Sequence, residues 1–223
     1  MDLFLPPLSS PRIPSPVPQN RKGLGFTLVE LLAVVAVTAM MATLAVPALS
    51  SINKTSQMNR AVTGLSLAIE QARAYAMANN TYVRVGLFSS TDESRVTLAT
   101  ITASGGAMAD FQTSTRYQPM NRPQQFENVA LLEENIPALA EMPSDATDLS
   151  TSQLGSFQAV AGGTNTSFDH VIQFGPSGEA VIGTPSQPRW LQLAIASTPE
   201  SQSGNCAVLQ VSGLTGQVRI FRP

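Results

Sequence analysis

Glu30 lies inside an otherwise apolar run of the chain. The run covers residues 26–49, and Glu30 is the only charged residue among these 24. As a helix rising about 1.5 Å per residue, the run would reach roughly 36 Å, which exceeds the ~30 Å hydrocarbon core of a bilayer. A carboxylate in that environment is costly unless it has a partner. We therefore interpret residues 26–49 as the transmembrane half of a long helix and Glu30 as a functional residue.

The flanking charges predict the orientation of this span. Arg12, Arg21 and Lys22 precede it, with only Asp2 of opposite sign. Basic residues next to a span stay in the cytoplasm. We expect a single-pass protein of the inner membrane, with a cytoplasmic N-terminus and a periplasmic or extracellular C-terminal domain.

Three other interpretations of the run compete. A secretory signal peptide would be cut near residues 46–48, but the length of the run and the Glu in its first turn argue against it. A plain single-pass anchor of unrelated function would let Glu30 reach the interface. A core helix of a soluble protein conflicts with the basic flank and the scarcity of polar positions.

The residues around the start of the run resemble the N-terminus of type IV pilins and type II secretion pseudopilins. The match is Arg21-Lys22, Gly25, and then the run Phe26-Thr27-Leu28-Val29-Glu30-Leu31-Leu32. The resemblance implies that prepilin peptidase cuts between Gly25 and Phe26 and methylates Phe26. Glu30 then becomes the fifth residue of the mature chain, as in the family. Pro47 becomes the twenty-second, where the family has a proline that bends the helix.

The physical chemistry of Glu30 agrees with this resemblance. Cleavage would expose a cationic amine on Phe26, and in a stack of subunits the Glu30 carboxylate of one chain can pair with that amine on its neighbour. Such a pair is stronger away from water, while an unpaired charge is heavily penalised there. Small residues recur along the same helix at a spacing that favours close helix approach; they are Ala33, Ala36, Ala39, Ala42 and Ala45.

Composition sets further limits. Residues 1–25 hold six prolines, which predicts an extended cytoplasmic leader that is removed. The net charge of −2 argues against broad binding to nucleic acid. Cys206 is the only cysteine, so we expect no internal disulfide and a buried thiol in a strand. His170 is the only histidine, and we predict a half-buried strand position, with no metal site and no cofactor.

The helix is predicted to continue as an exported amphipathic half over residues 50–80. Its apolar positions repeat at alternating spacings of four and three residues, which places them on one face; they are Met58, Val62, Leu65, Ile69, Ala72 and Ala76. Glu70 and Arg73 are placed to pair, and Asn79-Asn80 predicts the end of the helix. Gly64 is a soft point within it.

Residues 81–223 are predicted to form a β-sheet domain. Alternating or apolar segments between turn signals indicate strands; these segments are 81–88, 95–102, 171–174, 179–182, 190–196, 206–211 and 218–221. Residues 104–165 are less regular and predict an insertion in which only residues 126–132 suggest a strand. The fold class is α+β: a long N-terminal helix packed on an antiparallel sheet, a pilin-like arrangement by the resemblance above.

Short segments narrow the resemblance. Residues 71–76 and 79–83 look like the passage from helix to first strand in minor pseudopilins of the H type and their FimT-like relatives. Residues 174–178 and 216–219 look like later strands of that group. A prepilin-like family from four-gene cassettes, Verru_Chthon cassette protein D, is an alternative.

The sequence therefore predicts a structural subunit and not an enzyme. It would be a minor pilin or pseudopilin of a type IV pilus or a type II secretion system. Its partners would be prepilin peptidase, other such subunits, the inner membrane and, as a candidate, secreted cargo. A second interpretation is a minor pilin that binds DNA for uptake through Arg219 and Arg222, although two arginines on an acidic domain are thin support for phosphate contacts. An anchored enzyme lacks a nucleophile motif or metal spacing.

Overall fold

A computed structural model describes most of the chain after the predicted leader. The described residues are 26–90, 94–113, 116–133, 136–139, 141–183, 188–197 and 205–223. The chain divides into two units, Met1–Val46 and Pro47–Pro223. One helix, α1 (Leu28–Asn79), runs from the first unit into the second. Each unit is described by itself.

In the first unit, the described residues are Phe26, Thr27 and the beginning of α1. Large apolar side chains cover this part of the helix and are 54% to 79% exposed; they are Phe26, Leu28, Val29, Leu31, Leu32, Val34, Val35, Val37, Met40 and Met41. Within the described residues, no helix combines the length and the apolar character that crossing a membrane requires. The span at residues 26–49 stays a prediction from the sequence.

In the second unit, α1 buries the face that its sequence pattern predicts. Met58, Val62, Leu65, Ile69, Ala72 and Ala76 are each at most 1% exposed. The helix ends at Asn79, and Asn80 adopts a left-handed conformation with φ of 50°. The Thr81 amide donates to the Ala76 carbonyl at 3.0 Å, which closes a Schellman-type cap. Both the apolar face and the helix end are confirmed.

Six strands form the first sheet, in the order β10-β9-β1-β2-β3, with β4 also pairing with β2. All of its pairs are antiparallel. The strands are β1 (Val83–Ser90), β2 (Arg95–Ala103), β3 (Tyr117–Pro119), β4 (Gln124–Glu127), β9 (His170–Phe174) and β10 (Ala180–Val181). The strands predicted at residues 81–88, 95–102, 171–174 and 179–182 are confirmed as β1, β2, β9 and β10.

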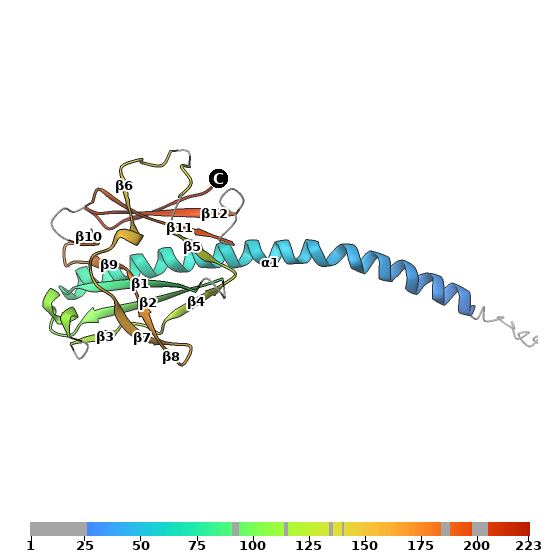
Figure 1. The fold of residues 1–223 in the computed structure, drawn as a ribbon, viewed down its shortest axis with the longest axis horizontal. Coiled ribbons are helices and arrows are strands. Elements are labelled where there is room, and N and C mark those ends of the chain that lie inside the picture. Colours follow the sequence, from blue (N-terminus) through green and yellow to red (C-terminus); the bar gives the residue numbers. More distant parts are fainter. Residues whose placement is uncertain are drawn as a thin grey trace, which may run out of the picture. The chain divides into compact units, whose positions relative to one another are not determined.

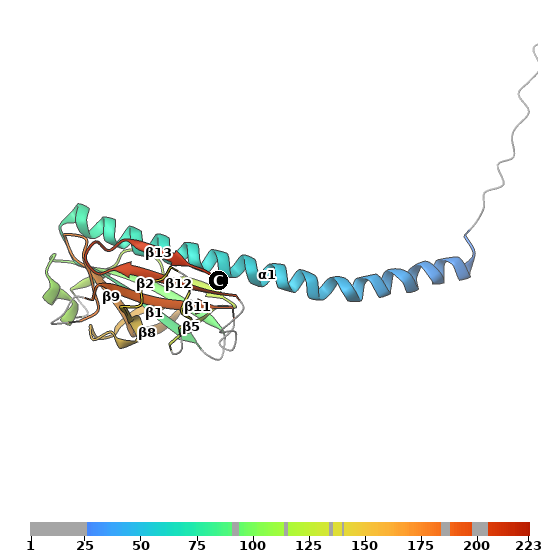
Figure 2. The same ribbon diagram turned by 90° about the horizontal axis from the view of Figure 1, so that it is seen from above.

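Five strands form the second sheet, in the order β13-β12-β11-β5, with β6 pairing with β11 in parallel. The strands are β5 (Ala130–Leu132), β6 (Ala146–Asp148), β11 (Trp190–Ala196), β12 (Cys206–Ser212) and β13 (Val218–Phe221). A separate hairpin pairs β7 (Phe157–Ala161) with β8 (Thr164–Phe168), and two short 3₁₀ helices are η1 (Met108–Gln112) and η2 (Leu149–Thr151). In Figure 1 the second part of α1 runs along both sheets, and Figure 2 shows both on the same side of it.

The α+β class is confirmed, but the arrangement of the strands corrects two expectations. The sequence predicted one antiparallel sheet, whereas the helix packs on two. Residues 104–165 are not only an insertion, because their short strands complete both sheets. The predicted strand at 126–132 is in fact two strands, β4 and β5, since Asn128 has a φ of 54° and the chain passes there from one sheet to the other.

Two glycines allow rings to approach the backbone. A Cβ on Gly64 would lie 2.6 Å from the Phe126 ring, so this position of α1 is a packing contact and not the expected soft point. A Cβ on Gly86 of β1 would lie 2.5 Å from the Phe157 ring and 2.7 Å from Phe168 Cβ. Phe157 and Phe168 stack with ring centroids 5.3 Å apart, and they belong to a second core cluster that includes neither α1 nor the second sheet.

The Gly86 contact predicts a measurable packing effect. Gly86→Ala should destabilise the full-length chain by roughly 1–3 kcal/mol, because the added methyl group overlaps a ring held between two strands. Chemical denaturation would measure the loss. Combining it with Phe157→Leu should recover part of that loss, and a purely additive double variant would contradict the contact.

Candidate functional site

Thr27 caps the first turn of α1. Its carbonyl accepts the Leu31 amide at 3.1 Å, and its hydroxyl oxygen Oγ1 accepts the Glu30 amide at 3.2 Å. These two bonds satisfy backbone groups that a helix start otherwise leaves open, and they define an N-cap. The pattern Thr-x-x-Glu at residues 27–30 is a capping-box sequence that the sequence analysis missed.

Glu30 lies in this first turn and is exposed. Within the described part of the chain, its carboxylate has no hydrogen bond and no ion pair, because its one polar contact is made by its backbone amide. The neighbouring exposed side chains are apolar. A negative charge thus stands on an apolar surface without an opposite charge. Phe26 precedes the cap and is 76% exposed, while Gly25 lies outside the described residues.

Pro47 lies inside α1 at the boundary of the two units. The helix continues on both sides of it. A proline inside a helix donates no backbone hydrogen bond and favours bending there. The bend itself stays a prediction.

The two C-terminal arginines have partners within the second unit. The Arg219 guanidinium in β13 lies over the Trp190 ring, 4.9 Å from its centroid. Arg222 Nη1 donates to Asn59 Oδ1 of α1 at 2.6 Å. Both side chains are exposed, and each contacts a different element, β11 for Arg219 and α1 for Arg222.

Glu70 joins the helix to the last strand. Its Oε1 accepts the Val218 amide of β13 at 3.0 Å, and its Oε2 accepts a bond from Arg73 Nη1 at 3.4 Å. The predicted pair of Glu70 and Arg73 is confirmed. One carboxylate therefore holds the strand that carries Arg219 against α1.

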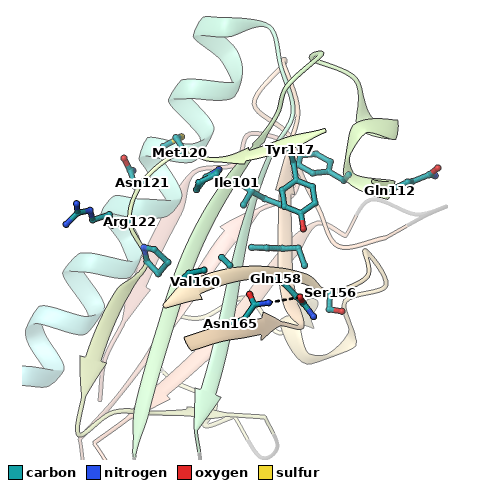
Figure 3. Close-up of a pocket in the computed structure, with 15 residues that line it drawn as sticks. Ile101, Gln112, Tyr117, Met120, Asn121, Arg122, Ser156, Gln158, Val160 and Asn165 are labelled. Carbon is teal, nitrogen blue, oxygen red and sulfur yellow. Dashed lines mark hydrogen bonds between the residues drawn. The ribbon is translucent and has the colours of Figure 1, made fainter. Parts of the chain in front are cut away.

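A groove of about 1060 Å³ opens between β3 and the β7–β8 hairpin (Figure 3). Ile101 of β2 and the rings of Tyr117 and Phe157 line it, and the two ring centroids are 6.4 Å apart. On the hairpin, Asn165 Nδ2 donates to Gln158 Oε1 at 3.0 Å. Asn121 and Arg122 stand at one end of the groove and Gln112 at the other, so polar groups bound an apolar floor.

A second cavity of about 370 Å³ borders Arg84. It shares Phe111, Gln112 and Ser156 with the groove, so the two adjoin. Arg84 is 8% exposed, and burial lowers its pKa to about 10. A buried guanidinium is a feature that the sequence analysis did not single out.

Cys206 and His170 are the remaining titratable residues that the sequence singled out. Cys206 is buried at the start of β12, as predicted, and burial raises the pKa of its thiol. The His170 ring contacts Asp169 Oδ1 at 3.0 Å and Glu133 Oε1 at 3.4 Å, at the start of β9. Among the described residues, no group of three or more His, Cys, Asp or Glu side chains is placed to hold a metal ion.

Comparison with known proteins identifies the N-terminal segment. The pattern described as "Prokaryotic N-terminal methylation motif" matches residues 20–46. The chain therefore carries the prepilin-type motif that its sequence resembles. No curated protein matches the sequence. The finer resemblances to H-type pseudopilins, FimT-like proteins and Verru_Chthon cassette protein D stay predictions.

Among solved structures, the type IV minor pilin FimU of Pseudomonas aeruginosa (strain PAO1) is similar to this chain with 12% sequence identity and a TM-score of 0.39. The alignment covers 75% of this chain and 90% of that protein. Similarity at this level does not establish a common fold or function.

The capping bond at Thr27 can be tested directly. Thr27→Ala should weaken the first helical turn by roughly 1 kcal/mol, because the Glu30 amide loses its acceptor. Hydrogen exchange at the Glu30 amide should then become faster. Thr38→Ala, which removes a hydroxyl bonded to carbonyls within the helix, is the matched control and should leave that amide unchanged. Unchanged exchange in Thr27→Ala would contradict the cap.

Proposed function

We propose that this chain is the precursor of a minor pilin or pseudopilin, a structural subunit of a type IV pilus or type II secretion pseudopilus. The observation that carries the proposal is the N-terminal methylation motif at residues 20–46 together with an unpaired Glu30 inside it. The motif supplies the processing step, and the unpaired carboxylate supplies a reason for subunits to associate. No catalytic role is proposed.

Processing would occur between Gly25 and Phe26. Prepilin peptidase would release residues 1–25 and methylate the new amine of Phe26. Phe26 and Thr27 lie before the first residue of α1, so the bond to be cut adjoins non-helical backbone. The exposed position of Phe26 agrees with access by an enzyme.

Assembly would pair Glu30 of one subunit with the Phe26 amine of its neighbour. The exposed apolar side chains around Glu30 would be covered by neighbouring helices in the filament, which excludes water and strengthens the pair. A carboxylate left among those helices without a cation would carry a large desolvation cost. The pair therefore favours one register between subunits as well as association.

Before assembly, residues 26–49 would hold the subunit in the inner membrane with its N-terminus in the cytoplasm. Support for this comes from the sequence, in which one charge interrupts 24 residues and basic residues precede them. The second unit, Pro47–Pro223, would face the periplasm or the exterior and present its surface to other subunits or to secreted cargo.

We do not propose DNA uptake as a function. Phosphate binding needs several clustered cations. Arg219 lies over Trp190 and Arg222 is bonded to Asn59 in the described chain.

The processing step predicts the mature N-terminus. Mass spectrometry of the chain produced together with a prepilin peptidase should find a protein that starts at a methylated Phe26. Gly25→Leu should leave the precursor uncut, because the peptidase of this family recognises the small residue before the bond. A mature chain that starts at Met1 or near residue 49 would overturn the proposal.

The assembly step predicts the behaviour of Glu30 variants. Glu30→Ala and Glu30→Gln should be cleaved nearly as well as the native chain but should enter filaments at least ten-fold less, because the amine of the neighbouring subunit loses its counter-charge. Quantification of the subunit in sheared filament fractions would measure this. Glu30→Asp, which keeps the charge, should retain part of the assembly, and equal assembly of all four chains would exclude the pair.

A further inference from the structure

Arg84 projects from β1 on the face of the first sheet that α1 does not cover. Its neighbours Val83 and Val85 pack into the core shared with the helix, so Arg84 takes the opposite face of the strand. There it is directly opposite Gln173 of β9, and its Nε donates to Gln173 Oε1 at 3.0 Å. Its guanidinium carbon lies 4.3 Å from the centroid of the Phe111 ring. Strand pairing and the ring thus fix the plane of the guanidinium.

The rest of that guanidinium has no partner. Among the described residues, Arg84 has no ion pair, and its Nη1 and Nη2 groups donate to no acceptor. Asp110, next to Phe111 on η1, is already used: its Oδ2 accepts the amides of Gly105 and Ala107 at 2.8 and 3.3 Å, and its Oδ1 is 4.0 Å from Arg116. A buried cation normally has a carboxylate beside it, and within the described chain this one does not.

The unpartnered nitrogens border open space. Arg84 is 8% exposed, so a small part of its side chain remains accessible. That access is to the 370 Å³ cavity that Arg84 lines. Gln112, Gln153 and Ser156 are exposed at its rim, and Phe111 forms an apolar wall. A fixed cation at the base of a pocket with an apolar wall and a polar rim is an arrangement that orients a ligand.

We propose that this cavity binds a carboxylate, presented by an acidic side chain of a partner protein, through Nη1 and Nη2 of Arg84. The guanidinium fork matches the two oxygens of a carboxylate. Arg84 is the only charged side chain among the described residues that line the cavity, so a singly charged group is neutralised while a phosphate is not. The adjoining groove offers space for the chain on either side of the acidic residue. This site lies in the second unit and does not depend on processing at Phe26.

The test compares small probes on the purified full-length chain. Acetylated glutamate amide, its glutamine counterpart, acetate, inorganic phosphate and an acidic heptapeptide would be titrated by calorimetry at pH 7. We expect the glutamate probe to bind at least ten-fold more tightly than the glutamine probe and phosphate, and the heptapeptide more tightly than acetate. Equal binding of the glutamate and glutamine probes would overturn the site. A heptapeptide that binds no better than acetate would overturn the partner protein as the source of the carboxylate.

Variants distinguish a loss of the binding site from a loss of the fold. Arg84→Lys should weaken the glutamate probe at least ten-fold because the fork is lost, and Arg84→Gln should abolish its binding. Arg189→Gln removes an exposed arginine outside the cavity and should bind like the native chain. Ser156→Glu, a rim change that leaves Arg84 in place, should also lower affinity because its own carboxylate competes. Native affinity in both Arg84→Gln and Ser156→Glu would contradict the proposal.

Discussion

The apolar face of α1 between Met58 and Ala76 is the contact that organises the second unit. Side chains of this face pack in one core with β1, β2 and β9 from the first sheet and with β11 and β12 from the second. Burial of apolar area is the main favourable term in such a unit. Because both sheets pack on the same helix face, a change in that face would disturb them together. Two local contacts add to this core. The Phe126 ring packs on Gly64 and joins β4 of the first sheet to α1, and the Glu70 bond joins β13 of the second sheet to α1.

Glu30 and Arg84 each lack an opposite charge among the described residues, and they define the two candidate sites. Glu30 stands among exposed apolar side chains of the first unit, and Arg84 stands in a pocket of the second. A charge in either environment costs free energy that an external partner can recover. The partner of Glu30 would be a copy of a related subunit, whereas Arg84 would receive a different molecule. Assembly and recognition are thus assigned to separate parts of one polypeptide.

The sequence predicted the long helix and the regular strands well, because their apolar positions repeat over many residues. It did not predict two sheets, since β5 and β6 are each three residues long, too short for a periodic pattern to show in the sequence. Their place is decided by pairing with β11, which lies far along the chain. Glu30 could be singled out because a charge inside an apolar run is evident from the sequence alone. Arg84 could not, since one arginine in an alternating strand looks like any exposed residue until Phe111 and Gln173 cover it.

The N-cap at Thr27 has a consequence for the proposed processing of the precursor. The two hydrogen bonds that end on Thr27 are made by residues downstream of the proposed cleavage bond. Proteolysis there would leave both of these bonds in place. Under the proposed processing, the capped helix start would persist in the product, which would need no refolding there before it meets its neighbours.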